Sequence, residues 1–179
     1  MEGDGAGGEI DLEEVDAFAE AAHAGQERRS GEPYIVHPRA VRAILEDEFP
    51  DPVDDLTLAI ALLHDVLEDC DVHPTILLER WGKDVQEGVT LLSWNLRALE
   101  IDRSPRIYWS GIRRGPRPVR LVKAADRIHN IRETVENPDG ALQEKYLAET
   151  ERELLPILRE AGEAWMVDQL EDLLERLRA

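Results

Sequence analysis

The sequence predicts an all-α protein, a single-domain orthogonal bundle of about eight to ten helices. The chain has 179 residues, of which 42% are hydrophobic, so it can build one ordinary core with little left for a second. Apolar residues recur at spacings of three and four through most of the chain, which is typical of helices. Aromatic residues are only 5%, and no alternation of apolar and polar residues lies between turn signals, which disfavours strands.

Apolar spacing, N-cap residues, prolines and glycines set the expected helices. They comprise one ending near Arg29, one from Pro38 to before Phe49, one from Asp54 or Asp55 through Leu67, and others over 74–81, 84–94, 104–115, 119–136, about 140–161 and 163–178. Residues 1–9, Gly-rich and acidic, are expected to form a flexible leader, and residues 10–179 the domain. Pro156 is expected to kink its helix, and the last two helices to pack rather than to carry chemistry.

Charge and cysteine content exclude several classes of protein. The chain carries 21 Lys and Arg against 39 Asp and Glu, a net charge of −18, so most of its surface repels a nucleic-acid backbone and general nucleic-acid binding is not expected. Cys70 is the single cysteine, which excludes an intrachain disulfide and fits a reducing cytoplasm. The sequence has neither an apolar run long enough for a membrane span nor a signal peptide, so a cytoplasmic protein without a membrane role is expected.

One stretch reverses the overall charge. Residues 103–132 hold nine Arg and Lys against a single acid, Asp126. A local cationic surface of this kind suits phosphate groups, because guanidinium forks bind them with good geometry. The alternative is a solvated helix face that balances nearby acids, and the sequence leaves both interpretations open.

The third expected helix carries the first cluster of potential chemistry. His64-Asp65 lies four residues before Glu68-Asp69, a spacing that places each residue of the first pair over one of the second on a continuous helix. Apolar residues precede and interrupt the cluster, so these carboxylates lie near the core and need compensation. A divalent cation would supply it, and His nitrogen with Asp oxygen suits Mn²⁺, Fe²⁺, Co²⁺, Zn²⁺ or Mg²⁺. The alternative is an exposed acidic face.

A second cluster lies in the segment from Lys123 to Asn130. Asp126 stands in an otherwise core-facing, Ala-rich stretch, with Asn130 four residues on. A buried ion pair between Asp126 and Arg127 or another cation would explain the acid without any ligand. His129 is expected to be a hydrogen-bonded structural histidine.

Three segments in order resemble the hydrolase domain of the RelA/SpoT family, which belongs to the HD superfamily of metal-dependent phosphohydrolases. They are residues 22–38 (AHAGQERRSGEPYIVHP), 62–69 (LLHDVLED) and 123–130 (KAADRIHN). The resemblance implies the HD-type helical fold, with the motif-bearing part at about 20–137 and packing helices at about 140–178. The family's synthetase and regulatory domains have no room here, so the resemblance implies a stand-alone alarmone hydrolase.

The resemblance also implies a reaction and a catalytic set. The reaction is removal of the 3′-pyrophosphate from ppGpp or pppGpp, giving GDP or GTP and pyrophosphate and lowering the alarmone of the stringent response. The implied ligands of one divalent ion, typically Mn²⁺, are His37, His64, Asp65 and Asp126. Glu68 and Asp69 match the pair that orients and deprotonates the attacking water. These roles agree with general metal and base catalysis of phosphoryl chemistry.

Four further residues match positions that contact the nucleotide. Arg28 matches the arginine that stacks on the base, and Arg29 stands where lysine is usual and can still bind phosphate. Tyr34 is expected to form a wall of the nucleotide pocket, and Asn130 matches a residue that contacts the nucleoside. Arg127 is expected to be a structural partner of nearby acids.

Two departures keep other functions open. The family often has Val-Thr-Lys-Leu where this chain reads Val89-Thr90-Leu91-Leu92. Residues 93–118, with Trp94, Tyr108 and Trp109, match none of the family's motifs given above and could line the pocket. A changed wall could select another nucleotide, such as an adenine alarmone, NADPH or a nucleotide mono- or triphosphate, without touching the ligands. A third possibility is a regulatory module that binds a nucleotide without turnover, and the sequence predicts no oligomeric state.

Overall fold

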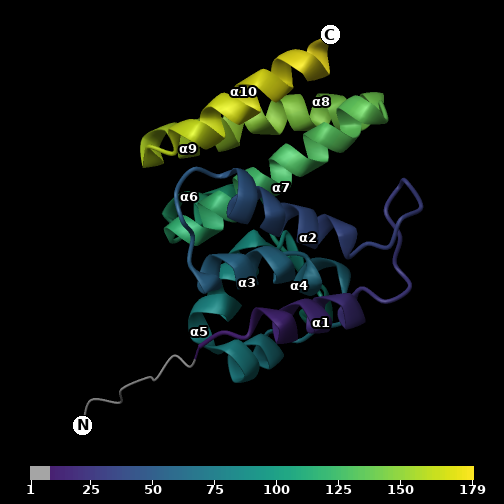
Figure 1. The fold of residues 1–179 in the computed structure, drawn as a ribbon, viewed down its shortest axis with the longest axis vertical. Helices are drawn as coiled ribbons and strands as arrows, with labels where there is room; N and C mark the ends of the chain where they lie inside the picture. The colour runs from purple at the N-terminus through teal and green to yellow at the C-terminus, as the bar shows by residue number, and fades with distance from the viewer. Residues whose placement is uncertain (1–8) are drawn as a thin grey trace.

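The computed structural model describes residues 9–179, which form an orthogonal bundle of α-helical segments (Figure 1). The helices are α1 Leu12–Ala22, α2 Val36–Ala43, α3 Asp55–Leu63, α4 Val66–Asp69, α5 Pro74–Leu92, α6 Pro105–Arg114, α7 Arg117–Glu136, α8 Gly140–Glu149, α9 Leu155–Ala161 and α10 Ala164–Arg178. The all-α prediction of about eight to ten helices is confirmed for these residues. Residues 1–8 of the expected leader lie outside the described part of the chain.

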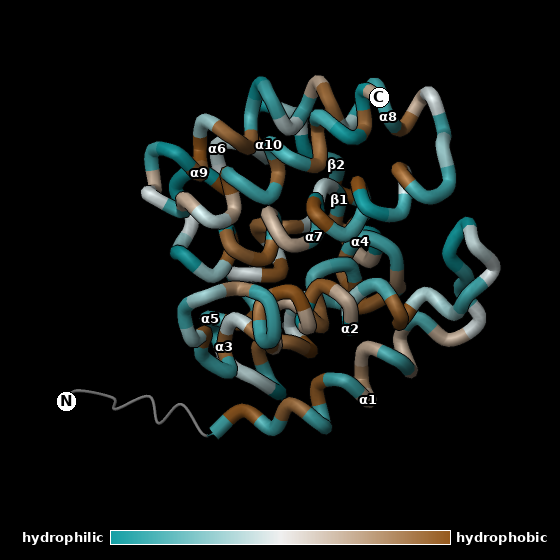
Figure 2. The backbone as a smooth tube through the Cα atoms, turned by 45° about the horizontal axis from the view of Figure 1, so that its top comes forward, coloured by the Kyte–Doolittle hydropathy of each residue, from teal (hydrophilic) through white to brown (hydrophobic). Residues whose placement is uncertain are grey.

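Helix α3 forms the centre of the bundle. Every residue from Thr57 to Leu63 is buried, and α1, α2, α5 and α7 all pack against this helix. Helices α8, α9 and α10 form an outer layer on the far side of α7, at the top of Figure 1 and opposite α1. Figure 2 shows the brown, hydrophobic stretches gathered where these layers meet. No helix within residues 9–179 has the length and apolar character that a membrane span requires.

The predicted continuous third helix is wrong at His64 and Asp65. Helix α3 ends at Leu63, and α4 begins at Val66 after Asp65, whose φ of −100° and ψ of −8° lie at the edge of the helical region. Side chains of adjacent residues in a regular helix point about 100° apart. The break instead turns both the His64 and Asp65 side chains toward one point, so His64 does not stack over Glu68 as the spacing predicted.

Other boundaries also follow local chemistry. Helix α1 ends at Ala22, not near Arg29, because Gly25 follows with a φ of +79°, which a helix cannot accommodate. Helix α2 begins two residues before Pro38. The expected break at Gly82 is present as a kink inside α5. The bend expected at Pro156 takes the form of a π-helical turn, Thr150–Leu154, just before the proline that lacks an N–H.

The segment between α5 and α6 holds a small antiparallel hairpin that the sequence did not predict. Strands β1 (Asn95–Leu96) and β2 (Ile101–Asp102) pair with each other, and a 3₁₀ turn joins them. Each strand is only two residues long, too short for an alternating pattern to register. The hairpin lies against α4.

The basic stretch over residues 103–132 does not form one free cationic surface. Five of its nine cations make ion pairs with acids of other segments or of the same helix: Arg113 with Glu160, Arg117 with Glu163, Lys123 with Asp126, Arg127 with Glu149, and Arg132 with Glu48. The arrangement favours the alternative in which these side chains balance the acidic remainder of the protein.

Candidate metal centre and active-site cleft

Four side-chain atoms converge at the centre of the molecule, where α2, the α3–α4 break and α7 meet. The Nε2 atoms of His37 and His64 lie 3.2 Å apart. Asp65 Oδ2 lies 3.5 Å from His37 Nε2 and 3.1 Å from His64 Nε2, and Asp126 Oδ1 lies 3.2 Å and 3.8 Å from the same two nitrogens. His37, His64 and Asp126 are buried, and Asp65 is half-buried. The structure therefore brings three of the predicted metal ligands, His37, His64 and Asp126, into one cluster and places Asp65 beside its two histidines.

The separations among His37, His64 and Asp126 fit a single divalent ion, and Asp65 lies next to the two histidines. Ligand atoms at about 2.0–2.2 Å from a metal lie about 3.0–3.5 Å apart when their bonds make angles between a right angle and a tetrahedral one. Four of the five contacts measured between these atoms fall in that range, and the His64–Asp126 separation of 3.8 Å corresponds to a wider angle. Two imidazole nitrogens and two carboxylate oxygens suit a first-row divalent metal.

Both histidines are oriented by a hydrogen bond at the other ring nitrogen. His64 Nδ1 donates to the carbonyl oxygen of Ala61 at 2.8 Å, and His37 Nδ1 lies 2.9 Å from Nδ1 of His129. Such partners fix the ring orientation and leave Nε2 free to bind a metal. The expectation that His129 is a hydrogen-bonded histidine is confirmed, and its partner is a predicted ligand.

The charges around the centre favour a cation. Burial acts against the protonated form of His64, but the Asp65 carboxylate overrides it and raises the pKa of His64 to about 9. Burial also acts against the ionised form of Asp126, yet Lys123 and the two histidines hold the pKa of this carboxyl well below its usual range. Lys123 Nζ donates to Asp126 Oδ2 at 2.8 Å and leaves Oδ1 facing the histidines. Positive charge is thus stabilised at this point.

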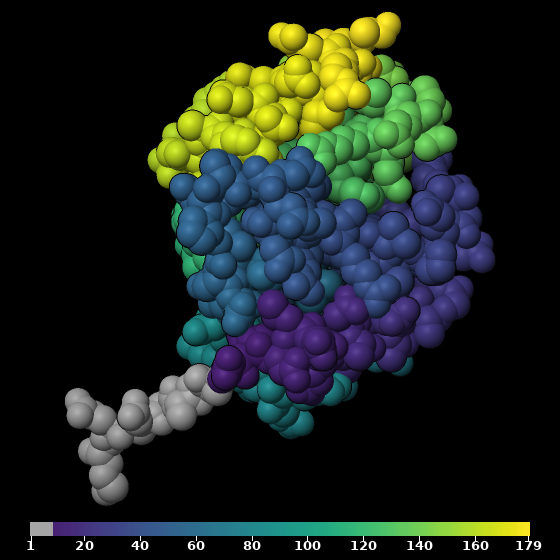
Figure 3. Space-filling model, viewed as in Figure 1, coloured from purple at the N-terminus to yellow at the C-terminus, as the bar shows by residue number. Residues whose placement is uncertain are grey.

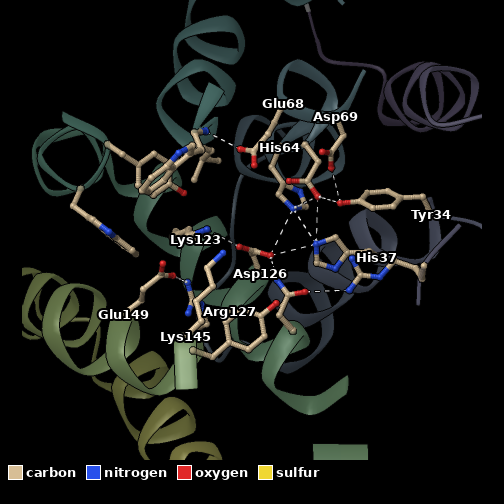
Figure 4. A pocket seen from close by; sticks show the side chains of 18 residues that line it. Tyr34, His37, His64, Glu68, Asp69, Lys123, Asp126, Arg127, Lys145 and Glu149 are labelled. Atoms are coloured by element: carbon tan, nitrogen blue, oxygen red, sulfur yellow. Dashed lines mark hydrogen bonds and ion pairs between the residues drawn. The ribbon is translucent and has the colours of Figure 1, made fainter. Parts of the chain in front are cut away.

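Glu68 and Asp69 lie beside the centre on the single turn of α4 (Figure 4). Glu68 accepts a hydrogen bond from the backbone N–H of Trp94 at 2.7 Å, and burial nevertheless raises the pKa of Glu68 to about 7. Burial, and then the Asp65 charge, also raises the pKa of Asp69. Both carboxyls therefore hold a proton more tightly than exposed acids do, which suits exchange of a proton with water near neutral pH.

Tyr34 does more than form a wall. Its hydroxyl lies 2.7 Å from Asp65 Oδ2 and 2.8 Å from Asp69 Oδ2, so one donor links a predicted ligand to the predicted catalytic pair. Its ring stacks on His23, with centroids 4.6 Å apart, and the Arg28 guanidinium lies 5.3 Å from the centroid of the ring. These contacts position the hydroxyl.

The centre opens into a cleft made of two adjoining cavities. The inner cavity, of about 510 Å³, contains all the predicted metal and catalytic residues. The outer cavity, of about 900 Å³, lies between the loop after α1 and the start of α8 and shares Arg28, Tyr34, Asn130 and Tyr146 with the inner one. Figure 3 shows these two distant segments meeting at the surface. Pockets of this size hold small organic ligands.

Three of the four expected nucleotide contacts, Arg28, Tyr34 and Asn130, line both cavities, and the fourth lies farther out. Arg28 donates to Asn130 Oδ1 at 3.1 Å and pairs with Glu133, while Asn130 Nδ2 donates to Asp126 Oδ1 at 2.5 Å. Arg29 lines only the outer cavity, where it is exposed and pairs with Asp139. Arg29 therefore lies farther from the metal centre than the other predicted substrate contacts.

The unmatched segment lines the inner cavity, as a changed wall would, whereas sequence reasoning missed the lining residues of α8. The inner cavity is also lined by Trp94, Tyr108 and Trp109 from the unmatched segment, and by Lys145, Tyr146 and Glu149 from α8. The expectation that the last helices only pack is thus wrong for α8. Figure 4 shows Lys145 on the same side of Asp126 as Lys123 and Arg127. Nothing in the amphipathic pattern of α8 separates a cleft-facing lysine from a solvated one.

Arg127 is a structural partner of an acid, as expected. Its guanidinium donates to Glu149 at 2.8 Å and lies 4.7 Å from the ring centroid of Tyr146. The pair fixes α8 against α7 and so fixes the side of the cleft that carries Lys145. The expected alternative of a buried ion pair at Asp126 is present, but its cation is Lys123 and not Arg127.

Comparison with known families decides the assignment of the fold. The HD domain family matches residues 16–155. This chain belongs to the HD-domain family. HD domains bind divalent metal, which agrees with the cluster of His37, His64 and Asp126.

Individual relatives confirm the resemblance to RelA/SpoT proteins. The chain is 36% identical over 159 residues to a probable GTP pyrophosphokinase of Mycobacterium leprae, covering 87% of this chain and 20% of that protein. It is 34% identical over 162 residues to a probable guanosine-3′,5′-bis(diphosphate) 3′-pyrophosphohydrolase of Synechocystis, covering 87% and 21%. This HD domain thus spans about a fifth of the length of the curated relatives it matches.

A solved structure matches over almost the whole chain. It is a metazoan orthologue of SpoT described as hydrolysing ppGpp, and it superposes with a TM-score of 0.77 at 25% identity, covering 92% of this chain and 94% of that one. The HD-type orthogonal bundle predicted from the motifs is therefore confirmed.

Proposed function

We propose that this HD domain hydrolyses the 3′-pyrophosphate of ppGpp and pppGpp, releasing GDP or GTP and pyrophosphate. One observation carries the proposal: a buried His-Asp cluster with metal-ligand spacing lies beside two carboxyls of raised pKa, at the inner end of a cleft lined by Arg28 and Asn130. The similarity to a ppGpp-hydrolysing SpoT orthologue over nearly the full chain supports it.

The two cavities divide the substrate between them. The nucleoside occupies the junction, where the Arg28 guanidinium offers a flat surface to the base and Asn130 offers polar contacts to the sugar. The 3′-phosphates extend into the inner cavity toward His37, His64, Asp65 and Asp126, where Lys123 and Lys145 add positive charge. The 5′-phosphates then lie toward the outer cavity, within reach of Arg29.

His37, His64, Asp65 and Asp126 hold one divalent ion, for which we propose Mn²⁺. When bound, such an ion polarises a phosphoryl oxygen and lowers the pKa of water. Glu68, ionised above about pH 7, accepts the proton of the attacking water. Asp69 and the Tyr34 hydroxyl orient that water, because Tyr34 already bridges Asp69 and Asp65. The reaction takes place in a reducing compartment such as the cytoplasm, where Cys70 stays a thiol.

The test is a product analysis. Metal-stripped protein is incubated with ppGpp, with and without Mn²⁺, and the nucleotides and pyrophosphate are separated by chromatography. We expect GDP and pyrophosphate in equal amounts and only with the metal. Metal bound stoichiometrically but no release of pyrophosphate would contradict the proposal.

A second candidate is hydrolysis of a different nucleotide by the same centre. It is favoured by Trp94, Tyr108 and Trp109, which place an aromatic wall in the inner cavity within the segment that departs from the family. The same chromatography with adenine alarmones, NADPH and nucleotide mono- and triphosphates separates the two candidates. A higher kcat/KM for one of these than for ppGpp would favour the second.

A further inference from the structure

We infer that the hairpin between α5 and α6 positions the catalytic carboxylates, and that Arg97 is the positioning residue through which it does so. The inference rests on the proposed function, in which Glu68 and Asp69 handle the attacking water. Arg97 lies in the segment 93–118, for which neither the helical pattern nor the family motifs assign a role. It does not line the inner cavity, so it acts through α4 and not on the substrate.

Helix α4 cannot hold its own geometry. It has four residues, and isolated single turns of helix are unstable because few hydrogen bonds offset the ordering of the backbone. Its first turn starts at the break after α3, where the N–H groups of Glu68 and Asp69 both bond to the carbonyl of Asp65. Its last residue, Asp69, is followed by the extended residue Cys70. Val66 and Leu67 anchor α4 in the core, and contacts from outside the helix hold the end that carries the two carboxylates.

Two side chains supply such contacts at the end of α4. The carbonyl oxygen of Asp69 accepts a hydrogen bond of 3.0 Å from Arg97 Nη1, on the hairpin side. It accepts a second of 3.0 Å from Gln26 Nε2, in the loop after α1. Gln26 is itself held by His23, 2.8 Å away. The end of α4 is thus clamped between the loop that carries Arg28 and the hairpin.

The hairpin also reaches the catalytic base directly. The backbone N–H of Trp94, one residue before β1, donates to Glu68 Oε2 at 2.7 Å. The carbonyl of Trp94 accepts from the N–H of Arg103 at 3.1 Å, which closes the base of the hairpin. Arg97 follows within the hairpin turn. The hairpin segment therefore contacts both catalytic residues. Trp94 bonds to the carboxylate of Glu68, 26 residues away in the chain, and Arg97 bonds to the backbone of Asp69, 28 residues away.

This arrangement predicts a particular kinetic signature. Loss of the Arg97 hydrogen bond loosens α4, which changes the alignment of Glu68 and Asp69 with the metal centre but leaves the nucleotide contacts of Arg28 and Asn130 in place. Misalignment of a catalytic group lowers kcat, whereas KM reports mainly the unchanged binding contacts when chemistry is slow. One hydrogen bond of this kind corresponds to a loss of roughly threefold to tenfold.

The experiment compares three variants of the full chain with Mn²⁺ and ppGpp. Arg97→Ala removes the donor, Arg97→Lys restores a donor of similar length, and Arg106→Ala is the control because Arg106 is an exposed arginine of α6 that lines neither cavity. We expect Arg97→Ala to lower kcat about threefold to tenfold with KM changed less than about twofold, and Arg97→Lys to recover most of the loss. Arg106→Ala is expected to behave as the parent.

Hydrogen exchange at the Trp94 amide gives a readout that needs no substrate. The amide is protected in the parent, because it donates to Glu68, and we expect faster exchange at this amide in Arg97→Ala, with the amides of α3 and α7 unchanged. Equal kcat and equal exchange in Arg97→Ala and Arg106→Ala would overturn the inference. A parent protein that does not hydrolyse ppGpp would contradict the proposed function. If the Trp94 amide nevertheless exchanges faster in Arg97→Ala than in the parent, the positioning role stands.

Discussion

The two walls of the cleft are built in opposite ways. One wall consists of His37, His64 and Asp126, whose side chains are 2%, 4% and 9% exposed and come from α2, the end of α3 and α7, which pack together in the core. The other wall consists of Glu68 and Asp69 on a single helical turn, with the hairpin of two-residue strands and the aromatic residues of the unmatched segment beside it. The side chains of the first wall lie in the core, whereas the second wall keeps only its apolar residues there and holds its two carboxylates by hydrogen bonds.

The difference separates two tasks. Metal ligands must keep their mutual distances within a few tenths of an ångström, and a close-packed core of helices supplies that rigidity. Water activation and substrate selection depend on groups that a hairpin and an outer helix present, and such segments change without disturbing the ligands. We therefore expect substitutions in the first wall to abolish metal binding, and those in the second to change turnover or selectivity while the metal stays bound.

The largest effect is expected for Asp65→Ala. It removes one ligand oxygen and the charge that stabilises His64, so we expect metal affinity to fall at least about 100-fold and activity to be lost. The measurement is metal titration by calorimetry together with the ppGpp assay. Asp71→Ala is the matched control, because Asp71 is exposed and close in sequence. Parent-like metal affinity in Asp65→Ala would remove Asp65 from the ligand set.

The substitution Glu68→Ala tests the second wall, where turnover and metal binding are expected to separate. We expect kcat to fall by a factor of about 10² to 10⁴, because the proton of the attacking water loses its acceptor, while metal affinity stays at the parent value. Turnover is measured under saturating Mn²⁺, and metal is measured by titration. The control is Glu79→Ala, an exposed glutamate of α5. Undiminished turnover would show that another group accepts the proton.

The pH dependence of the activity tests the role of Glu68 in the second wall. Burial raises the pKa of Glu68 to about 7, and a general base acts only when ionised, so activity should rise with pH through about 7 and fall about tenfold per unit below it. Metal occupancy is measured at each pH, since protonation of ligand histidines would also reduce activity. A rate independent of pH between about 5 and 8 at full occupancy would argue against this role.

Arg28→Ala is expected to act on binding alone. Arg28 lines both cavities and lies against Tyr34, so its loss should raise KM about tenfold with little change in kcat. Arg29→Ala serves as the comparison, because Arg29 is exposed and lines only the outer cavity, and a smaller rise is expected. An unchanged KM in Arg28→Ala would count against base stacking at this position.

The smallest effect is expected for Lys145→Ala. Lys145 lines the inner cavity, and among residues 9–179 it forms no ion pair with an acid, so its charge is available to a phosphate. We expect KM for ppGpp to rise about fivefold and the rise to shrink at high salt. Lys83→Ala, an exposed lysine of α5, is the control. A salt-independent result equal to the control would show that Lys145 does not meet the phosphates.

The sequence alone determined the helical class and predicted the residues of the candidate metal centre. Periodic apolar residues mark the buried face of each helix, and this local signal predicted α3, α7 and α10 within a few residues. Polar residues inside buried stretches stand out against that pattern and so indicate His64, Asp65 and Asp126, and the order of three motifs adds His37. The two-residue strands of the hairpin left no such pattern, and the exposed position of Lys145 did not distinguish it from other surface lysines.

Only the tertiary structure decided how these residues meet. The break at Asp65 stays close to helical backbone angles, so it leaves no trace in the spacing, yet it turns His64 and Asp65 toward the same point. The hydrogen bonds from Trp94 and Arg97 to α4 join residues more than twenty positions apart, and Lys145 reaches the cleft because Arg127 and Glu149 fix α8 against α7. Helical spacing describes one helix at a time, whereas the cleft is formed by the packing of several.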